Sequence, residues 1–337
     1  MPLDQNFRNI VVIGASAGGV EALKHLFRCL PSDLPAAFLV VLHIPAHSPS
    51  ELSGILSHET AMRVVSAESD QPLQSSTVYV ASADHHLLLV AEGIRVTRGP
   101  KECRVRPAID VLFRSASVAY QSRVIGVILT GTLDDGTAGL WAVKDRNGLA
   151  FVQQPSEAAQ DSMPKSAIQH VETDFIGTLS ELADEIAMNI KIPINCCEPR
   201  PSNERHLIET GVSTNGNGLE AGVMSIGKIS SYTCPDCHGV LVQIAEGSII
   251  RFRCHTGHAF SIKTLIAEVN AAIDTGLWDT LRAVEERILL LRQMGDLAEA
   301  QGATKDADLC RSQARNAEER LKPLRELVLD PDFFQTS

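Results

Sequence analysis

The amino-acid sequence predicts a three-layer α/β domain with a doubly wound, mostly parallel sheet, followed by a small cysteine-rich ribbon and an α-helical hairpin. The α/β domain is indicated by short, unbroken apolar runs that alternate with helical patterns between residues 9 and 190. Strands of a parallel sheet that is covered on both faces have such runs. The ribbon is indicated by clustered cysteine and histidine residues within 226–262, and the hairpin by two apolar stripes after residue 262.

Five apolar runs are predicted to form the strands of the sheet. They are NIVVIGA (9–15), AAFLVVLHI (36–44), VYVASAD (78–84), VIGVILT (124–130) and LAFVQQ (149–154). A helix is predicted after Gly18, where apolar residues recur at helical spacing. Residues 86–99 differ, because two strand-like runs flank Glu92 and Gly93, which predicts an antiparallel hairpin.

The chain is predicted to have four parts: the α/β domain (1–190), a linker (191–225), the ribbon module (226–262) and the helical hairpin (263–337). The linker is rich in Pro, Gly, Asn and Ser and has no sustained periodicity. In the hairpin, apolar residues recur at alternating steps of four and three, which is typical of helices paired within one chain or in a homo-oligomer. These residues are Leu277, Leu281, Val284, Ile288 and Leu291, and then Cys310, Ala314, Ala317, Leu321, Leu324 and Val328.

The composition excludes several classes of protein. Of the 337 residues, 30 are Lys or Arg and 41 are Asp or Glu, which gives a net charge of −11 and argues against nucleic-acid partners and anionic membranes. No run approaches the ~18 apolar residues of a membrane span, and the first ten residues lack the apolar core of a signal peptide. We therefore expect a cytoplasmic protein without membrane insertion, in which the eight cysteines are free thiols or metal ligands.

The first strand ends in Gly14-Ala15-Ser16-Ala17-Gly18, which matches the pattern G-x-S-x-G. A serine between glycines, after a buried strand and before a helix, lies on a sharp turn at the carboxyl edge of the sheet, as a nucleophile would. The same glycines resemble a phosphate-binding loop, with Ser16 in place of its second glycine. The turn alone leaves both hypotheses open.

A nucleophilic serine needs a base and a group that orients the base. His43 follows the second strand, and Asp134 and Asp135 follow the strand at 124–130. Singly, the histidine could be a buried structural residue and an aspartate an ordinary helix N-cap. Together, Ser16, His43 and Asp135 follow three strands of one parallel sheet and therefore share an edge, which predicts a catalytic triad. The order Ser…His…Asp differs from that of the α/β-hydrolases.

The α/β domain resembles the catalytic domain of the bacterial chemotaxis protein-glutamate methylesterases over roughly residues 9–190. The likeness rests on motifs in family order: IGASAGG, HIP, YVASADHH, RPAIDVLF, GVILTGTLDDGTAG and MPKSAI. It implies that Ser16 is the nucleophile, His43 the base and Asp135 the orienting carboxylate. It also implies an oxyanion site made by the backbone N–H groups of Thr132 and of Ala17, the residue after the nucleophile.

The resemblance further implies that His86 and Arg106 lie near the site as substrate-binding residues. It implies that the activity is hydrolysis of γ-glutamyl methyl esters on a methylated chemoreceptor, with glutamine deamidation in some members. That chemistry requires no metal. A cognate methyltransferase is a candidate partner. Three departures stand out: the segment GTLDDG, Cys103 where an asparagine is common, and a catalytic sequence that begins by residue 9, so that we expect no phosphorylation-receiver domain in this chain.

A second constellation consists of Cys234-x-x-Cys237 and Cys254-x-x-x-His258, separated by two strand-like runs around Glu246 and Gly247. This is the layout of a zinc ribbon, in which a hairpin brings two metal-binding turns together. Four ligands with no open position indicate a structural zinc ion. His238 and His255 are other candidates for the fourth ligand, but each directly adjoins a cysteine ligand, whereas the chain can turn at Gly257 before His258. The alternative to a metal site is a set of buried thiols. Members of the methylesterase family without a receiver domain carry a similar segment and a helical tail.

Two further hypotheses about function come from other classes. The α/β domain could bind a modified protein without turning it over, as an adaptor in signalling. It could also hydrolyse a different ester or amide. The presence of Ser16, His43 and Asp135 together favours an enzyme over an adaptor, because a binding protein has no need of all three.

Overall fold

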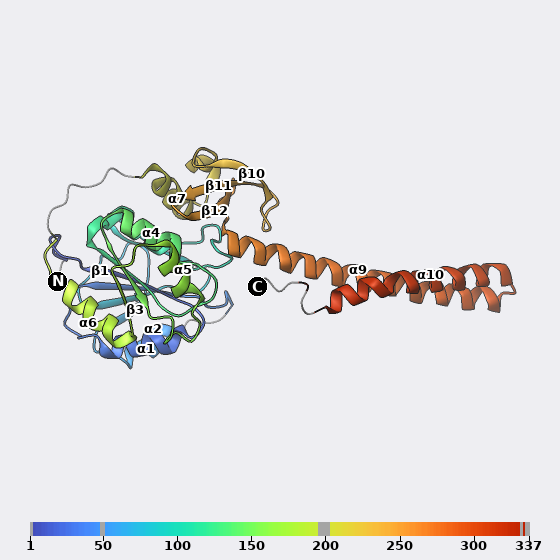
Figure 1. The fold of residues 1–337 in the computed structure, drawn as a ribbon, viewed down its shortest axis with the longest axis horizontal. Helices are drawn as coiled ribbons and strands as arrows, with labels where there is room; N and C mark the ends of the chain where they lie inside the picture. The colour runs from blue at the N-terminus through green and yellow to red at the C-terminus, as the bar shows by residue number, and fades with distance from the viewer. Residues whose placement is uncertain (1–2, 48–50, 195–202, 331–332, 334–337) are drawn as a thin grey trace. The chain divides into compact units, whose positions relative to one another are not determined.

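A seven-stranded, wholly parallel sheet forms the centre of the N-terminal part (Figure 1). The computed structural model describes residues 3–47, 51–194, 203–330 and 333. In spatial order the strands are β3 (Arg63–Ser66), β4 (Thr77–Val80), β2 (Ala37–Leu42), β1 (Ile10–Ala15), β7 (Val124–Ile128), β8 (Leu149–Gln153) and β9 (Phe175–Gly177). All five predicted strands are present; the two that the sequence did not reveal, β3 and β9, are short and only partly buried.

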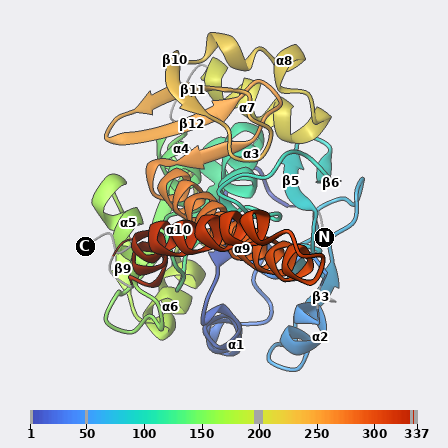
Figure 2. The ribbon, with the colours of Figure 1, turned by 90° about the vertical axis from the view of Figure 1, so that its right-hand side faces the viewer.

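Helices cover both faces of this sheet (Figure 2). One face carries α1 (Gly19–Cys29), α2 (Leu52–Ser57) and α6 (Leu179–Asn189), and the other carries α3 (Ile109–Tyr120), α4 (Thr137–Asp145) and α5 (Ser162–His170). Successive residues of a strand point to opposite faces, so Val11 and Ile13 pack with the first group while Ile10 and Val12 pack with the second. Every residue of β1 is therefore buried, and the prediction of a doubly wound sheet is confirmed.

The predicted antiparallel hairpin is formed by β5 (His86–Val90) and β6 (Gly93–Thr97). Its turn is one residue earlier than expected, because Gly93 already pairs with Val90. After β6 the chain runs through residues 98–108 and then into α3.

Residues 191–225 are not simply a linker. They contain α7 (Glu204–Asn215), α8 (Gly218–Ala221) and the 3-10 turn Val223–Ser225, while 195–202 lie outside the described residues. Helix α7 packs against α3 and β6. Its buried face includes His206, Glu209 and Ser213, so a search for apolar periodicity could not detect it.

The ribbon module is an antiparallel sheet in the order β10 (Lys228–Thr233), β11 (Val240–Glu246), β12 (Ile249–Cys254) and β13 (Ala259–Ser261). The two strands predicted around Glu246 and Gly247 are β11 and β12. The module has a small core, made by Cys234, Leu241, Phe252, Cys254, Phe260 and Leu265.

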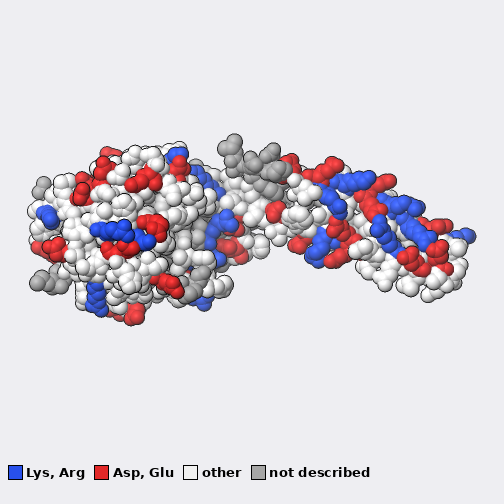
Figure 3. Space-filling model, turned by 90° about the horizontal axis from the view of Figure 1, so that it is seen from below, with Lys and Arg blue, Asp and Glu red and all other residues white. Residues whose placement is uncertain are grey.

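Two long helices follow, α9 (Ile262–Ala300) and α10 (Thr304–Leu329). The predicted stripes pack against each other, with Leu281 and Ile288 of α9 buried against Ala314 and Leu321 of α10. Acidic and basic side chains alternate on their exposed faces (Figure 3), including the pairs Arg292–Glu318, Arg311–Glu299 and Arg325–Glu285. Among the described helices, none is both long and apolar enough to cross a membrane.

By its internal contacts the chain divides into two compact units, Met1–Leu265 and Ile266–Ser337. The α/β domain, α7 and the ribbon thus belong to one unit, and the division into four parts stays a prediction.

Candidate active site

Three side chains from neighbouring strands meet at the carboxyl edge of the sheet. Ser16 follows β1, His43 follows β2, and Asp135 lies in the loop between β7 and α4. Strand β1 pairs in parallel with β2 on one side and with β7 on the other. The loops that follow these three strands therefore leave the sheet side by side. The His43 Nδ1 atom is 3.0 Å from Ser16 Oγ, and its Nε2 atom is 2.8 Å from Asp135 Oδ2. The structure therefore brings together the three residues predicted as a triad, in one hydrogen-bonded chain.

Asp135 is held by backbone donors. Its Oδ2 atom accepts a hydrogen bond from the N–H of Ile109 at 2.7 Å, and its Oδ1 atom accepts from Asp110 at 3.1 Å and Gly136 at 2.9 Å. Ile109 and Asp110 form the first turn of α3, whose N-terminal end favours negative charge. The N-cap of α4 is Gly136, without a side-chain cap. The alternative that Asp135 is only an N-cap residue therefore does not fit its contacts.

The Ser16 turn depends on close backbone approaches. Gly18 has a φ of 78° at the start of α1, a conformation that costs glycine little. A Cβ atom on Gly131 would lie 2.8 Å from Ser16 Cβ and 2.1 Å from Met163 Sδ. The loop after β7 can therefore approach the serine this closely only with glycine at 131.

The predicted oxyanion donors are Ala17, which directly follows the serine, and Thr132, which lies in the loop after β7 at the same sheet edge. Ala17 and Thr132 are both exposed. In the part of the chain that the structure describes, no hydrogen bond engages either backbone N–H group. Both groups are free to bind a ligand, and their role as an oxyanion site stays a prediction.

His86 does not fit the predicted contact with substrate. Its side chain is 0% exposed, Nε2 donates to the Pro100 carbonyl at 2.9 Å, and Nδ1 accepts from the Ala108 N–H at 3.3 Å. Burial lowers the pKa of this imidazole and favours its neutral form. Because both nitrogens are occupied by the backbone, His86 holds the segment between β6 and α3 rather than a ligand.

Arg106 lies at a cavity of about 320 Å³ next to His43. Its guanidinium binds Asp84 Oδ1, with distances of 2.6 and 2.9 Å, and the Gly99 carbonyl at 2.6 Å. Lys101, Arg104 and Val105 of the same segment also line this cavity. Lys101, Arg104, Val105 and Arg106 therefore form one side of the space that a substrate next to His43 would enter.

Asp110 is a buried acid that the sequence analysis missed. Burial, and then the negative charge of Asp135, raise the pKa of Asp110 to about 8. Its Oδ1 atom accepts from the Gly139 N–H at 2.6 Å, and the Cys103 thiol is 3.9 Å from its Oδ2 atom. The position lies within the motif RPAIDVLF, but nothing in a single sequence shows that this side chain points inward.

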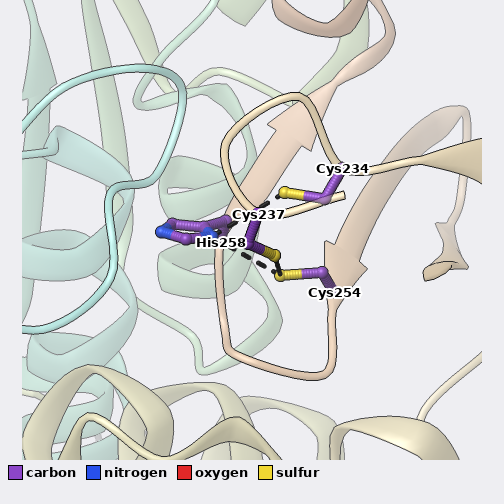
Figure 4. Close-up of side chains that lie close together, drawn as sticks. All are labelled: Cys234, Cys237, Cys254 and His258. Atoms are coloured by element: carbon purple, nitrogen blue, oxygen red, sulfur yellow. Dashed lines mark hydrogen bonds between the residues drawn. The ribbon is translucent and has the colours of Figure 1, made fainter. Parts of the chain in front are cut away.

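The four predicted metal ligands converge in the ribbon (Figure 4). Cys237 Sγ and Cys254 Sγ are 3.7 Å apart, and His258 Nδ1 is 3.7 Å from Cys234 Sγ and 3.6 Å from Cys254 Sγ. A tetrahedral zinc ion with Zn–S bonds of ~2.3 Å and Zn–N bonds of ~2.0–2.1 Å separates its ligands by roughly 3.5–3.8 Å. The cluster fits that ion, and the geometry favours His258 as the fourth ligand.

The α/β domain matches known proteins. Residues 11–186 match the protein family described as CheB methylesterase. A Leptospira interrogans (serovar copenhageni) protein named protein-glutamate methylesterase/protein-glutamine glutaminase is 38% identical over 175 residues, 52% of this chain and 91% of that protein. A Methanosarcina barkeri protein named in the same way is 35% identical over 187 residues, 53% of this chain and 51% of that protein.

A solved structure is similar over the same part. The crystal structure of the Thermotoga maritima CheB methylesterase catalytic domain superimposes with a TM-score of 0.52 and 32% identity, over 53% of this chain and 97% of that chain. The family match contains Ser16, His43 and Asp135 and ends before α7 and the ribbon.

Proposed function

Because this chain belongs to the CheB methylesterase family, we propose that it is a serine hydrolase that converts γ-methyl esters of protein glutamates into glutamate and methanol. The observation that carries the proposal is the hydrogen-bonded chain from Ser16 through His43 to Asp135. An anion-binding loop would need neither the histidine nor the aspartate. The names of the relatives point to methylated glutamates of a protein as the substrate, and the family resemblance implies that this protein is chemoreceptor-like.

The reaction begins when His43 Nδ1 takes the Ser16 proton and Ser16 Oγ attacks the ester carbonyl. The N–H groups of Ala17 and Thr132 hold the negative oxygen that forms, at about 3 kcal/mol for each donor in comparable sites. His43 then returns the proton to the leaving methoxide, and methanol departs. Water, activated by the same imidazole, hydrolyses the acyl-enzyme to glutamate and regenerates Ser16.

Asp135 keeps the imidazole in the productive tautomer. Nδ1 must be unprotonated to accept from Ser16, so the ring proton belongs on Nε2 and is donated to Asp135 Oδ2. The negative carboxylate also stabilises the imidazolium that forms during attack. The same acyl chemistry, with ammonia as the leaving group, would deamidate protein glutamine.

The ribbon is proposed to hold one structural zinc ion through Cys234, Cys237, Cys254 and His258. With three thiolates and one imidazole there is no open coordination position, so zinc would supply folding free energy rather than chemistry.

Two assays test the proposal. A fluorophosphonate probe should label Ser16, and labelling should disappear in His43→Ala. Methanol release from a methylated chemoreceptor should fall at least about 10³-fold in Ser16→Ala. Methyl ester hydrolysis that persists in Ser16→Ala would overturn the assignment of the nucleophile. Binding of the methylated receptor without probe labelling would indicate an adaptor, and faster turnover of simple esters than of receptor would indicate another substrate.

A further inference from the structure

Residues 102–105 form a tight turn at the cavity beside His43. The N–H of Val105 donates to the Glu102 carbonyl at 3.0 Å, and the N–H of Glu102 donates back at 3.3 Å. The two central residues, Cys103 and Arg104, have φ values of 50° and 73°. Consecutive residues other than glycine in this region are unfavourable and persist only when their surroundings hold them there.

The ribbon supplies part of that support through the backbone. The N–H of Cys103 donates to the Ala259 carbonyl at 2.9 Å, and the N–H of Ala259 donates to the Lys101 carbonyl at 3.1 Å. Ala259 begins β13 and directly follows His258, one of the four metal-ligand candidates. A second contact from β13 reaches the loop between β7 and α4, which carries Asp135. There, Ser261 Oγ donates to Asp134 Oδ1 at 2.7 Å.

Buried charges supply the rest of the support. The Glu102 carboxylate, 2% exposed, accepts hydrogen bonds from Arg114 of α3 at 2.7 and 2.8 Å and from Ser213 of α7 at 3.0 Å, and it pairs with Arg253 of β12 at 2.8 Å. Burial by itself would raise the pKa of Glu102, but the charges of Arg114 and Arg253 outweigh it and hold the pKa at about 2.

Arg253 connects this network to the metal cluster. Its side chain is 0% exposed, it binds Glu209 of α7 at 2.9 Å, and it donates to the Gly257 carbonyl at 2.8 Å. Arg253 precedes Cys254, and Gly257 precedes His258. Separating such buried partners leaves charges without compensation, so α3, α7, the ribbon and the turn stay together only when all are folded.

We infer that the ribbon positions the 102–105 turn, with Glu102 and Arg253 as positioning residues, so that metal binding at Cys234, Cys237, Cys254 and His258 controls how well the cavity beside His43 receives a protein substrate. Because the ribbon core is small, a bound metal would add substantially to the stability of the module. The kinetic consequence rests on the proposed esterase function; the structural consequence does not.

The first test uses the full chain with zinc bound, after chelation, and after zinc is added back. Hydrogen exchange at the Cys103 and Val105 amides should quicken at least about tenfold on chelation and recover with zinc, while exchange in β1 stays unchanged. Faster exchange in the ribbon with unchanged protection of Cys103 and Val105 would overturn the inference, and so would unchanged exchange in both. This readout is independent of any activity, so its failure is distinct from failure of the esterase proposal.

The second test is kinetic. Glu102→Gln should raise KM for the methylated protein at least about fivefold. The rate of fluorophosphonate labelling of Ser16 should change less than about twofold, because the triad residues follow β1, β2 and β7 of the central sheet. Ser213→Ala removes one hydrogen bond to Glu102 and should raise KM less, and it serves if Glu102→Gln does not fold. Glu92→Gln, on the exposed β5–β6 turn, is the matched control and should change neither. An unchanged KM in both variants would refute the positioning role. A fall in the labelling rate as large as the rise in KM would refute it too.

Discussion

The imidazole of His43 presents Nδ1, and not Nε2, to the hydroxyl of Ser16, at 3.0 Å. Its Nε2 atom is committed to Asp135 at 2.8 Å. In the Ser-His-Asp arrangement of the chymotrypsin type the two ring nitrogens have the opposite assignment. The proposed proton transfer would therefore use Nδ1 in place of Nε2. It requires the neutral tautomer with the ring proton on Nε2.

Asp135→Asn should abolish that tautomer preference. An asparagine amide can donate to Nε2, which moves the ring proton to Nδ1 and removes the acceptor that Ser16 needs. We expect kcat to fall by about 10⁴-fold. Some loss of stability should accompany it, because the amide NH2 group replaces an oxygen that accepts backbone hydrogen bonds. Nitrogen NMR of the His43 ring would report the tautomer, and kcat the consequence. Asp134→Asn, which keeps an acceptor for Ser261, is the neighbouring control; an equal loss there would contradict the assignment.

Gly131→Ala should damage the site through packing. The added Cβ atom would lie 2.8 Å from Ser16 Cβ and 2.1 Å from Met163 Sδ, so the serine turn or the loop after β7 must move. We expect destabilisation of about 1–3 kcal/mol and a lower kcat. Gly54→Ala is the matched control, because its Cβ atom would meet nothing within 4 Å. Thermal unfolding and probe labelling of Ser16 would measure both effects.

Asp110 should make stability depend on pH. Its folded pKa of about 8 exceeds the value of about 3.9 in an unfolded chain. Between these values the native state binds more protons, so rising pH lowers the free energy of unfolding, by at most about 1.4 kcal/mol per pH unit from this group. Asp110→Asn should flatten the curve between pH 4 and 8, and the exposed Asp33→Asn should not. Urea unfolding across this range is the measurement, and an unchanged slope in Asp110→Asn would contradict the assignment.

The ribbon should contain one zinc ion in each chain. Cys234→Ser should lose it and unfold the ribbon, because the metal contributes on the order of 10 kcal/mol in comparable small sites. Cys29→Ser, at an exposed thiol outside the cluster, should keep the full zinc content. Elemental analysis of the purified protein gives the stoichiometry. Full zinc content in Cys234→Ser would exclude that residue as a ligand.

Sequence patterns predicted the strands in which every residue is buried. Continuous apolar runs revealed β1, β2 and β7, and the shared edge of parallel strands then brought Ser16, His43 and Asp135 together. Cysteine spacing predicted that Cys234, Cys237, Cys254 and His258 come together, and the structure places them together. That they bind zinc stays a prediction.

Features held by polar contacts escaped prediction. Helix α7 buries Glu209 and Ser213, so its sequence resembles a solvated linker. His86 was assigned to the site from its motif position, but which way a side chain points depends on tertiary contacts with Pro100 and Ala108. Glu102 and Arg253 are far apart in the chain, and charged residues are usually exposed, so their burial as a pair has no local signature.

The Glu102–Arg253 pair limits how this chain can be divided into fragments. Cutting the chain near residue 190 would remove Arg253 and Ser213, which bind Glu102. Glu102 and Arg114, which are buried in the full chain, would then be exposed to water. An α/β fragment made in this way would differ from the parent at the very surface that adjoins its substrate cavity. Grafting the fragment onto another regulatory domain would therefore transplant the triad without the scaffold that shapes its entrance.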